Sequence, residues 1–114
     1  MADHITIRKA PGIWTVRSGG AVLAETANAL ELLEGDYAPV IYFPRGDIAM
    51  AFLDKTAKTS HCPHKGDASY YSIVSPSSTL ENAAWSYEDP FEAMAPIKGH
   101  LAFYTGDKVT VERI

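Results

Sequence analysis

The chain has 114 residues, of which 46% are hydrophobic and 21% charged, and its net charge at pH 7 is −4. This size fits one domain, residues 1–114, with a single core, and the acidic balance excludes a nucleic-acid backbone as the main partner, because phosphate binding needs a basic face. A single cysteine excludes an intrachain disulfide. No apolar stretch approaches the roughly 20 residues that span a bilayer, and the first residues lack the basic and apolar regions of a signal peptide. We therefore expect a cytoplasmic protein without a membrane partner.

Short strand patterns dominate the chain. Alternating apolar and polar residues, or runs of β-branched and aromatic residues, are typical of strands. Turn-forming residues separate these runs, and Ser18, Gly19 and Gly20 in particular fit a tight hairpin. About eight strands are predicted in this way, at residues 5–7, 14–16, 21–24, 39–43, 69–74, 80–87, 101–104 and 109–111.

The segment 27–34 is ambiguous. Its residues have helical propensity, but Leu30 and Leu32 alternate with glutamate, so we interpret the segment as a strand. Many short strands with little helix predict a mainly β domain, either a sandwich or an open barrel.

Two short helical turns are expected between the strands. Asp47 fits the N-cap of a helix over 48–53, and Asp89 fits the cap of another over 91–95. Arg45 and Asp47 are interpreted as a surface ion pair.

The stretch from His61 to Tyr71 concentrates chemically active side chains, with two histidines, the only cysteine, a lysine and an aspartate. A zinc site is one interpretation, but structural zinc takes four ligands, normally as spaced pairs. A four-cysteine site is excluded because Cys62 is alone. A mixed site of His61 or His64 with Asp67 stays open, but the same residues are more typical of a polar turn. We expect no metal and no cofactor.

Cys62 itself has two interpretations. As a nucleophile it would need a lowered pKa, which His61, His64 and Lys65 would provide. A lone cysteine more often packs as a small apolar residue, and Pro63 fixes the backbone directly after it. The core interpretation is therefore favoured over catalysis.

A site for a small anionic ligand is the favoured interpretation of this stretch. Lys65 and Gly66 place an ammonium beside backbone N–H groups, which suits a phosphate or a carboxylate, although the spacing of a P-loop is absent. Asp67 has two open roles, because it fits a hydrogen bond to the ligand and equally an Asx cap of the turn.

Aromatic residues on two strands that we expect to be neighbours extend this site. Tyr70 lies on the first strand, and Trp85 and Tyr87, two residues apart, share a face of the second. Aromatic rings with a few polar groups are typical of small-molecule pockets, and a tryptophan in a small β domain is also typical of its core. Glu88 and Asp89 add carboxylates at the end of the second strand.

Four stretches of the chain, in order, carry a resemblance to one known family. They are residues 42–47, 61–70, 84–90 and 99–104. Together they resemble the domain-of-unknown-function-427 family, sometimes labelled nucleotidyltransferase-like, over most of the chain from about residue 11. The resemblance implies a small β-tent, in which two antiparallel sheets lean together and meet at one edge. Better-known β-tent relatives bind zinc through two cysteine pairs, a pattern that the lone Cys62 does not match, and the chain has no paired-carboxylate motif for two-metal phosphoryl chemistry.

These observations predict a domain that binds a small polar or anionic ligand in a cleft between the turn at 61–70 and the strand at 85–87. Two alternatives remain: an enzyme that uses Cys62 or His64, and a protein-interaction module. The candidate ligand-binding residues are His61, His64, Lys65, Asp67, Tyr70, Trp85 and Tyr87.

Overall fold

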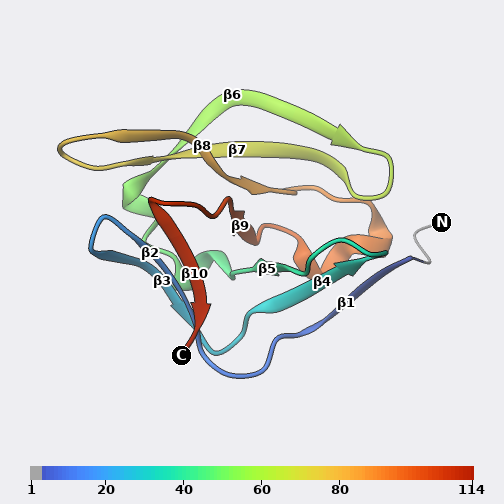
Figure 1. Ribbon diagram of the computed structural model, residues 1–114. Coiled ribbons are helices and arrows are strands. Elements are labelled where there is room, and N and C mark those ends of the chain that lie inside the picture. Colours follow the sequence, from blue (N-terminus) through green and yellow to red (C-terminus); the bar gives the residue numbers. More distant parts are fainter. Residues whose placement is uncertain (1–3) are drawn as a thin grey trace.

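The computed structural model describes residues 4–114 of the chain. Strands make up most of it, arranged in three antiparallel sheets, and short 3₁₀ turns form its helical part (Figure 1). The mainly β class predicted from the alternation is therefore confirmed. Within the described part of the chain, no helix is long and apolar enough to cross a membrane.

Each sheet combines strands from different parts of the sequence. The first sheet has the order β1-β4-β5, with β1 (Ile5–Lys9), β4 (Leu30–Glu34) and β5 (Val40–Tyr42). The second sheet has the order β10-β2-β3, with β10 (Val109–Arg113), β2 (Trp14–Ser18) and β3 (Ala21–Thr26). The third sheet has the order β6-β7-β8-β9, with β6 (Leu53–Cys62), β7 (Gly66–Val74), β8 (Thr79–Ser86) and β9 (Leu101–Phe103). The 3₁₀ turns are η1 (Arg45–Asp47), η2 (Met50–Phe52) and η3 (Glu92–Ile97).

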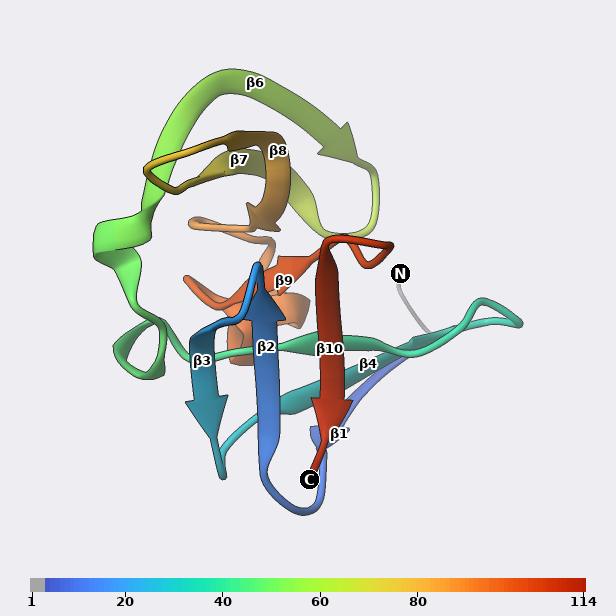
Figure 2. The same ribbon diagram turned by 60° about the vertical axis from the view of Figure 1, so that its left-hand side comes forward.

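A pair of backbone hydrogen bonds joins the first and third sheets at their edges. The Phe43 N–H donates to the Leu101 carbonyl at 2.8 Å, and the Leu101 N–H donates back at 3.0 Å. The resemblance predicts two sheets that lean together and meet at one edge, and the first and third sheets are bridged at an edge in this way, with the second core cluster between them. The second sheet packs against the other face of the third sheet: Figure 2 shows β3, β2 and β10 side by side, with β6, β7 and β8 curving above them.

Most of the predicted strands are confirmed within a few residues. The ambiguous segment 27–34 is a strand over β4, and Gly19 and Gly20 form the hairpin that joins β2 to β3. The last two strands, β9 and β10, are close in sequence but belong to different sheets.

The long strand β6 was not expected, because the sequence patterns predict no strand between residues 43 and 69. Most of its residues are exposed, and it pairs on one side only, with β7. An edge strand that faces water on both sides carries no apolar alternation. A register shift between Lys55 and Thr59 interrupts the strand further.

The helical turns are present, but their caps differ from the prediction. Asp47 does not cap η2, whose N-cap residue is Ala49. Instead, the Asp47 carboxylate accepts a hydrogen bond from the Thr26 hydroxyl at 2.7 Å. η3 begins after Phe91 without a side-chain cap, so the cap assigned to Asp89 is wrong. Such short 3₁₀ turns satisfy their backbone with i to i+3 bonds and depend less on a capping side chain than an α-helix does.

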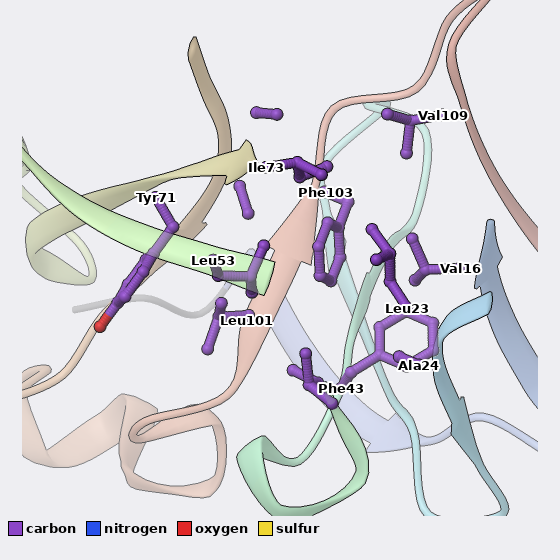
Figure 3. Close-up of a cluster of buried hydrophobic side chains, with 13 residues drawn as sticks. Val16, Leu23, Ala24, Phe43, Leu53, Tyr71, Ile73, Leu101, Phe103 and Val109 are labelled. Atoms are coloured by element: carbon purple, nitrogen blue, oxygen red, sulfur yellow. The ribbon is translucent and has the colours of Figure 1, made fainter. Parts of the chain in front are cut away.

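Two apolar clusters form the core, on opposite faces of the third sheet. The first lies between the third and second sheets (Figure 3), where the rings of Phe43 and Phe103 meet edge to face with their centroids 6.0 Å apart. The second lies between the third sheet, the first sheet and η3. Because β7 is buried on both faces, the adjacent residues Tyr70 and Tyr71 belong to different clusters.

The turn between β6 and β7 depends on the backbone conformation of Gly66. Its φ is +113°, and the backbone of Pro90 and Phe91 packs against it, with the Phe91 N–H donating to the Lys65 carbonyl at 3.0 Å. A Cβ at this position would come 3.4 Å from the Pro90 Cα atom.

We expect Gly66→Ala to lower the free energy of unfolding by about 1–3 kcal/mol, because an L residue is strained at this φ. Chemical denaturation measures the change. Gly46→Ala is the matched control, since a Cβ there meets nothing within 4 Å and needs no positive φ. Equal loss of stability in both variants would contradict the assignment of strain to Gly66.

Candidate functional site

Four of the seven candidate residues lie on one face of the third sheet. The register pairs Tyr70 with Trp85, and paired residues of antiparallel strands point to the same side. Tyr87 follows on this side, in the second core cluster with Tyr70. The Lys65 ammonium lies 5.9 Å from the centroid of the Tyr87 ring, so the lysine joins the same group.

His61 and Asp67 lie on the opposite face. They are register partners on β6 and β7, and Asp67 is three residues from Tyr70, so the alternation of the strand points it away from the tyrosine. His61 Nδ1 lies 2.7 Å from Asp67 Oδ1, and their side chains are 62% and 81% exposed. An exposed pair of this kind contributes little to stability.

Lys65 is buried and already paired. Its Nζ lies 2.8 Å from Glu34 Oε1, and the lysine is only 8% exposed. Burial lowers the pKa of Lys65, but the ion pair with Glu34 and the neighbouring Cys62 outweigh burial and raise it. The hydrogen bond from Lys65 lowers the pKa of Glu34. Both groups are therefore charged at neutral pH, and Glu34 neutralises the lysine inside the fold.

His64 and Cys62 lie beside this ion pair. The His64 ring meets the His4 ring edge-on at 4.5 Å, and His4 Nε2 lies 3.4 Å from Glu34 Oε2. Cys62 is half-buried and packs against the second core cluster. Among residues 4–114, no group of three or more His, Cys, Asp and Glu side chains is arranged to hold a metal ion.

Tyr70, Trp85 and Tyr104 form an aromatic row across this face of the third sheet. The rings of Trp85 and Tyr104 lie 4.5 Å apart between centroids, tilted by 43°. The Trp85 indole N–H donates to the Tyr42 hydroxyl at 3.3 Å. Burial raises the pKa of Tyr42, so this hydroxyl stays protonated. Tyr104 is half exposed, so the row reaches the surface.

Trp85 and Tyr104 line a groove of about 570 Å³ where all three sheets come together. An adjoining hollow of about 420 Å³ shares two lining residues with the groove and is also lined by Glu34, the partner of Lys65. Aromatic and apolar side chains make up most of the groove wall. The lining residues of the groove are Trp14, Glu31, Ala38, Pro39, Val40, Ile41, Trp85, Phe103, Tyr104, Thr105 and Val111.

A polar network that the sequence did not predict lies on the other face of the sheet. Arg45 Nη2 donates to Glu88 Oε2 at 3.0 Å, and its Nε donates to the Gly99 carbonyl at 3.1 Å. Arg45 Nη1 donates to the Tyr71 hydroxyl at 3.0 Å. The predicted pairing of Arg45 with Asp47 is therefore wrong.

Glu88 is the centre of this network. Its second oxygen accepts a hydrogen bond from Lys55 Nζ at 2.7 Å, and the Tyr71 hydroxyl donates to the first. Burial raises the pKa of Glu88, but the hydrogen bonds from Lys55 and Tyr71 outweigh it and lower the pKa to about 2. The one signal in the sequence was that Arg45, Glu88 and Gly99 lie in three of the four stretches that carry the family resemblance.

The family assignment follows from the comparison with known families. The family described as Domain of unknown function (DUF427), with the short name NTP_transf_9, matches residues 6–114. The chain therefore belongs to this family, as its four stretches predicted. A search of curated proteins found no match to the chain.

We expect Glu88→Gln to lower the free energy of unfolding at neutral pH by about 1–2 kcal/mol, because the half-buried guanidinium of Arg45 and the buried phenol of Tyr71 lose a charged partner. The stabilisation by Glu88 is fully present above its ordinary pKa of 4.5 and is lost as the pH falls toward about 2. The difference between wild type and variant should therefore be constant above about pH 5.5 and shrink below it.

Denaturant unfolding at a series of pH values measures this difference. Glu81→Gln on β8 is the control, because Glu81 is exposed and has no ion-pair partner among the described residues. A Glu88→Gln deficit that stays constant down to pH 2 would show that the charge of Glu88 does not stabilise the fold.

Proposed function

We propose that this domain binds a small molecule with a planar ring in the groove lined by Trp85 and Tyr104. The observation that carries the proposal is the aromatic pair of half-buried Trp85 and half-exposed Tyr104, whose rings form one wall of a groove at the meeting of the sheets. Trp14 of β2 and Ile41 of β5 add apolar side chains to the wall of the groove. A planar ring gains both apolar contact and stacking from such walls.

The size and lining of the groove support a small ligand. Pockets for small molecules typically enclose about 300–1,000 Å³ and combine apolar and aromatic walls with a few polar groups. The groove has a volume of about 570 Å³ and carries Glu31 and Thr105 among its aromatic and aliphatic lining. Its polar groups are few, which suits a ligand that is flat and mainly apolar with one polar end.

Trp85 connects this groove to the residues singled out in the sequence. Tyr70 is its register partner, and Lys65 lies on the same side of the sheet. The ligand predicted from sequence was polar or anionic, and Lys65 was its proposed counter-ion. Because Glu34 already holds Lys65, a ligand anion would have to displace Glu34 to use this charge. The aromatic wall, and not Lys65, is therefore the basis of the proposal.

A thermal-shift screen tests the proposal with planar ring acids, their neutral amides, nucleotides and sugar phosphates. A ligand at 100 times its dissociation constant stabilises the protein by about 2.7 kcal/mol, which corresponds to a shift of several degrees for a domain of this size. We expect planar ring compounds to give the largest shifts. We expect Tyr104→Ala to reduce these shifts, because it removes half of the aromatic pair.

Phe91→Ala is the matched control, since Phe91 is 47% exposed and Tyr104 is 50% exposed. It should lower the melting temperature of the free protein without changing the shift that a ligand causes. Ligand shifts that survive Tyr104→Ala unchanged, or a screen in which no planar compound stabilises the protein, would contradict the proposed function.

A further inference from the structure

Lys58 lies next to the aromatic row, on the edge strand β6. Its ammonium sits 4.5 Å from the centroid of the Tyr70 ring, in a cation–π arrangement. Tyr70 is the register partner of Trp85, which lines the groove. Lys58 is exposed, and among residues 4–114 no carboxylate forms an ion pair with it.

Hydroxyl groups gather beside this ammonium. The Ser60 hydroxyl lies 2.9 Å from the Tyr70 hydroxyl. Burial, and then the neighbouring Tyr70, raise the pKa of Tyr104 to about 12, so its phenol remains a hydrogen-bond donor at neutral pH. Lys58, Ser60, Tyr70 and Tyr104 thus place one cation and three hydroxyls at one end of the aromatic row.

The carboxylates that line the groove and the adjoining hollow are both held within the fold. Glu31 lines the groove, but its carboxylate is held by Arg8 Nε at 2.8 Å. Glu34 lines the adjoining hollow and is held by Lys65. Lys58 is therefore a cation beside the row whose charge no carboxylate of residues 4–114 balances.

We propose that Lys58, with the hydroxyls of Ser60, Tyr70 and Tyr104, is an anion subsite, and that the ligand is a planar ring compound with a single carboxylate. This inference rests on the proposed function, because the ring has to lie in the groove for its acid group to reach Lys58. One lysine balances one negative charge. A phosphate ester carries about −1.5 to −2 at pH 7 and would be left partly uncompensated.

A pair of probes with the same shape tests the subsite: naphthalene-2-carboxylate and the neutral naphthalene-2-carboxamide. Ligand-observed NMR titrations give their dissociation constants for wild type and for Lys58→Gln. We expect wild type to bind the carboxylate about two- to fivefold tighter than the amide, the range of an exposed charge pair. Lys58→Gln should remove this preference, so that the dissociation constants of the two probes become equal.

Lys98→Gln is the control, because it removes an exposed lysine of equal charge that, unlike Lys58, is not in cation–π contact with Tyr70. It should keep the preference for the carboxylate. Raising the salt concentration should reduce the preference in wild type and have no effect in Lys58→Gln.

The possible failures are distinguishable. If wild type binds both naphthalenes equally, ligand binding in the groove is supported and the assignment of an anion subsite is wrong. If Lys58→Gln keeps the preference, another cation provides it and the assignment to Lys58 is wrong. If neither compound binds, the proposed function itself fails. Binding of 2-naphthyl phosphate tenfold tighter than the carboxylate would overturn the proposed ligand class.

Discussion

The register between β7 and β8 determines which side chains lie on each face of the third sheet. Tyr70 is opposite Trp85 and Tyr71 is opposite Ala84, so the two neighbouring tyrosines point to different sides of the sheet. Tyr70 faces the second core cluster and the aromatic row, whereas Tyr71 faces the first cluster and hydrogen-bonds to Arg45 and Glu88. A slip of one residue would exchange the two environments and dismantle both sites.

Two internal ion pairs hold the loops around this sheet, one on each face. Arg45 ties η1 to Glu88 at the end of β8, and Lys65 ties the turn after β6 to Glu34 at the end of β4. Both ion pairs are partly shielded from water, and in each pair the two charges neutralise each other. Among residues 4–114, the acids that line the groove and the adjoining hollow already have partners, which leaves the charge of Lys58 unbalanced by these acids.

The sequence predicted much of the fold but a smaller part of the candidate site. The alternation of Leu30 and Leu32 was enough to assign a strand against helical propensity, and four ordered stretches identified the family. β6 was missed because an exposed edge strand has no apolar period, and Lys58 was missed with it. The pairing of Arg45 with Glu88 joins residues 43 positions apart and leaves no local pattern. Only the three-dimensional arrangement brings them together.

The central claim is that the aromatic groove holds the ligand, and the two tryptophans of the chain test it directly. Both Trp14 and Trp85 line the groove, so their indole N–H resonances report on it without any substitution. In a titration of ¹⁵N-labelled protein with naphthalene-2-carboxylate, we expect both indole resonances to move saturably and further than the backbone amides of His61 and Asp67, whose side chains lie on the opposite face. Movement of those two amides while both indole resonances stay in place would contradict this account.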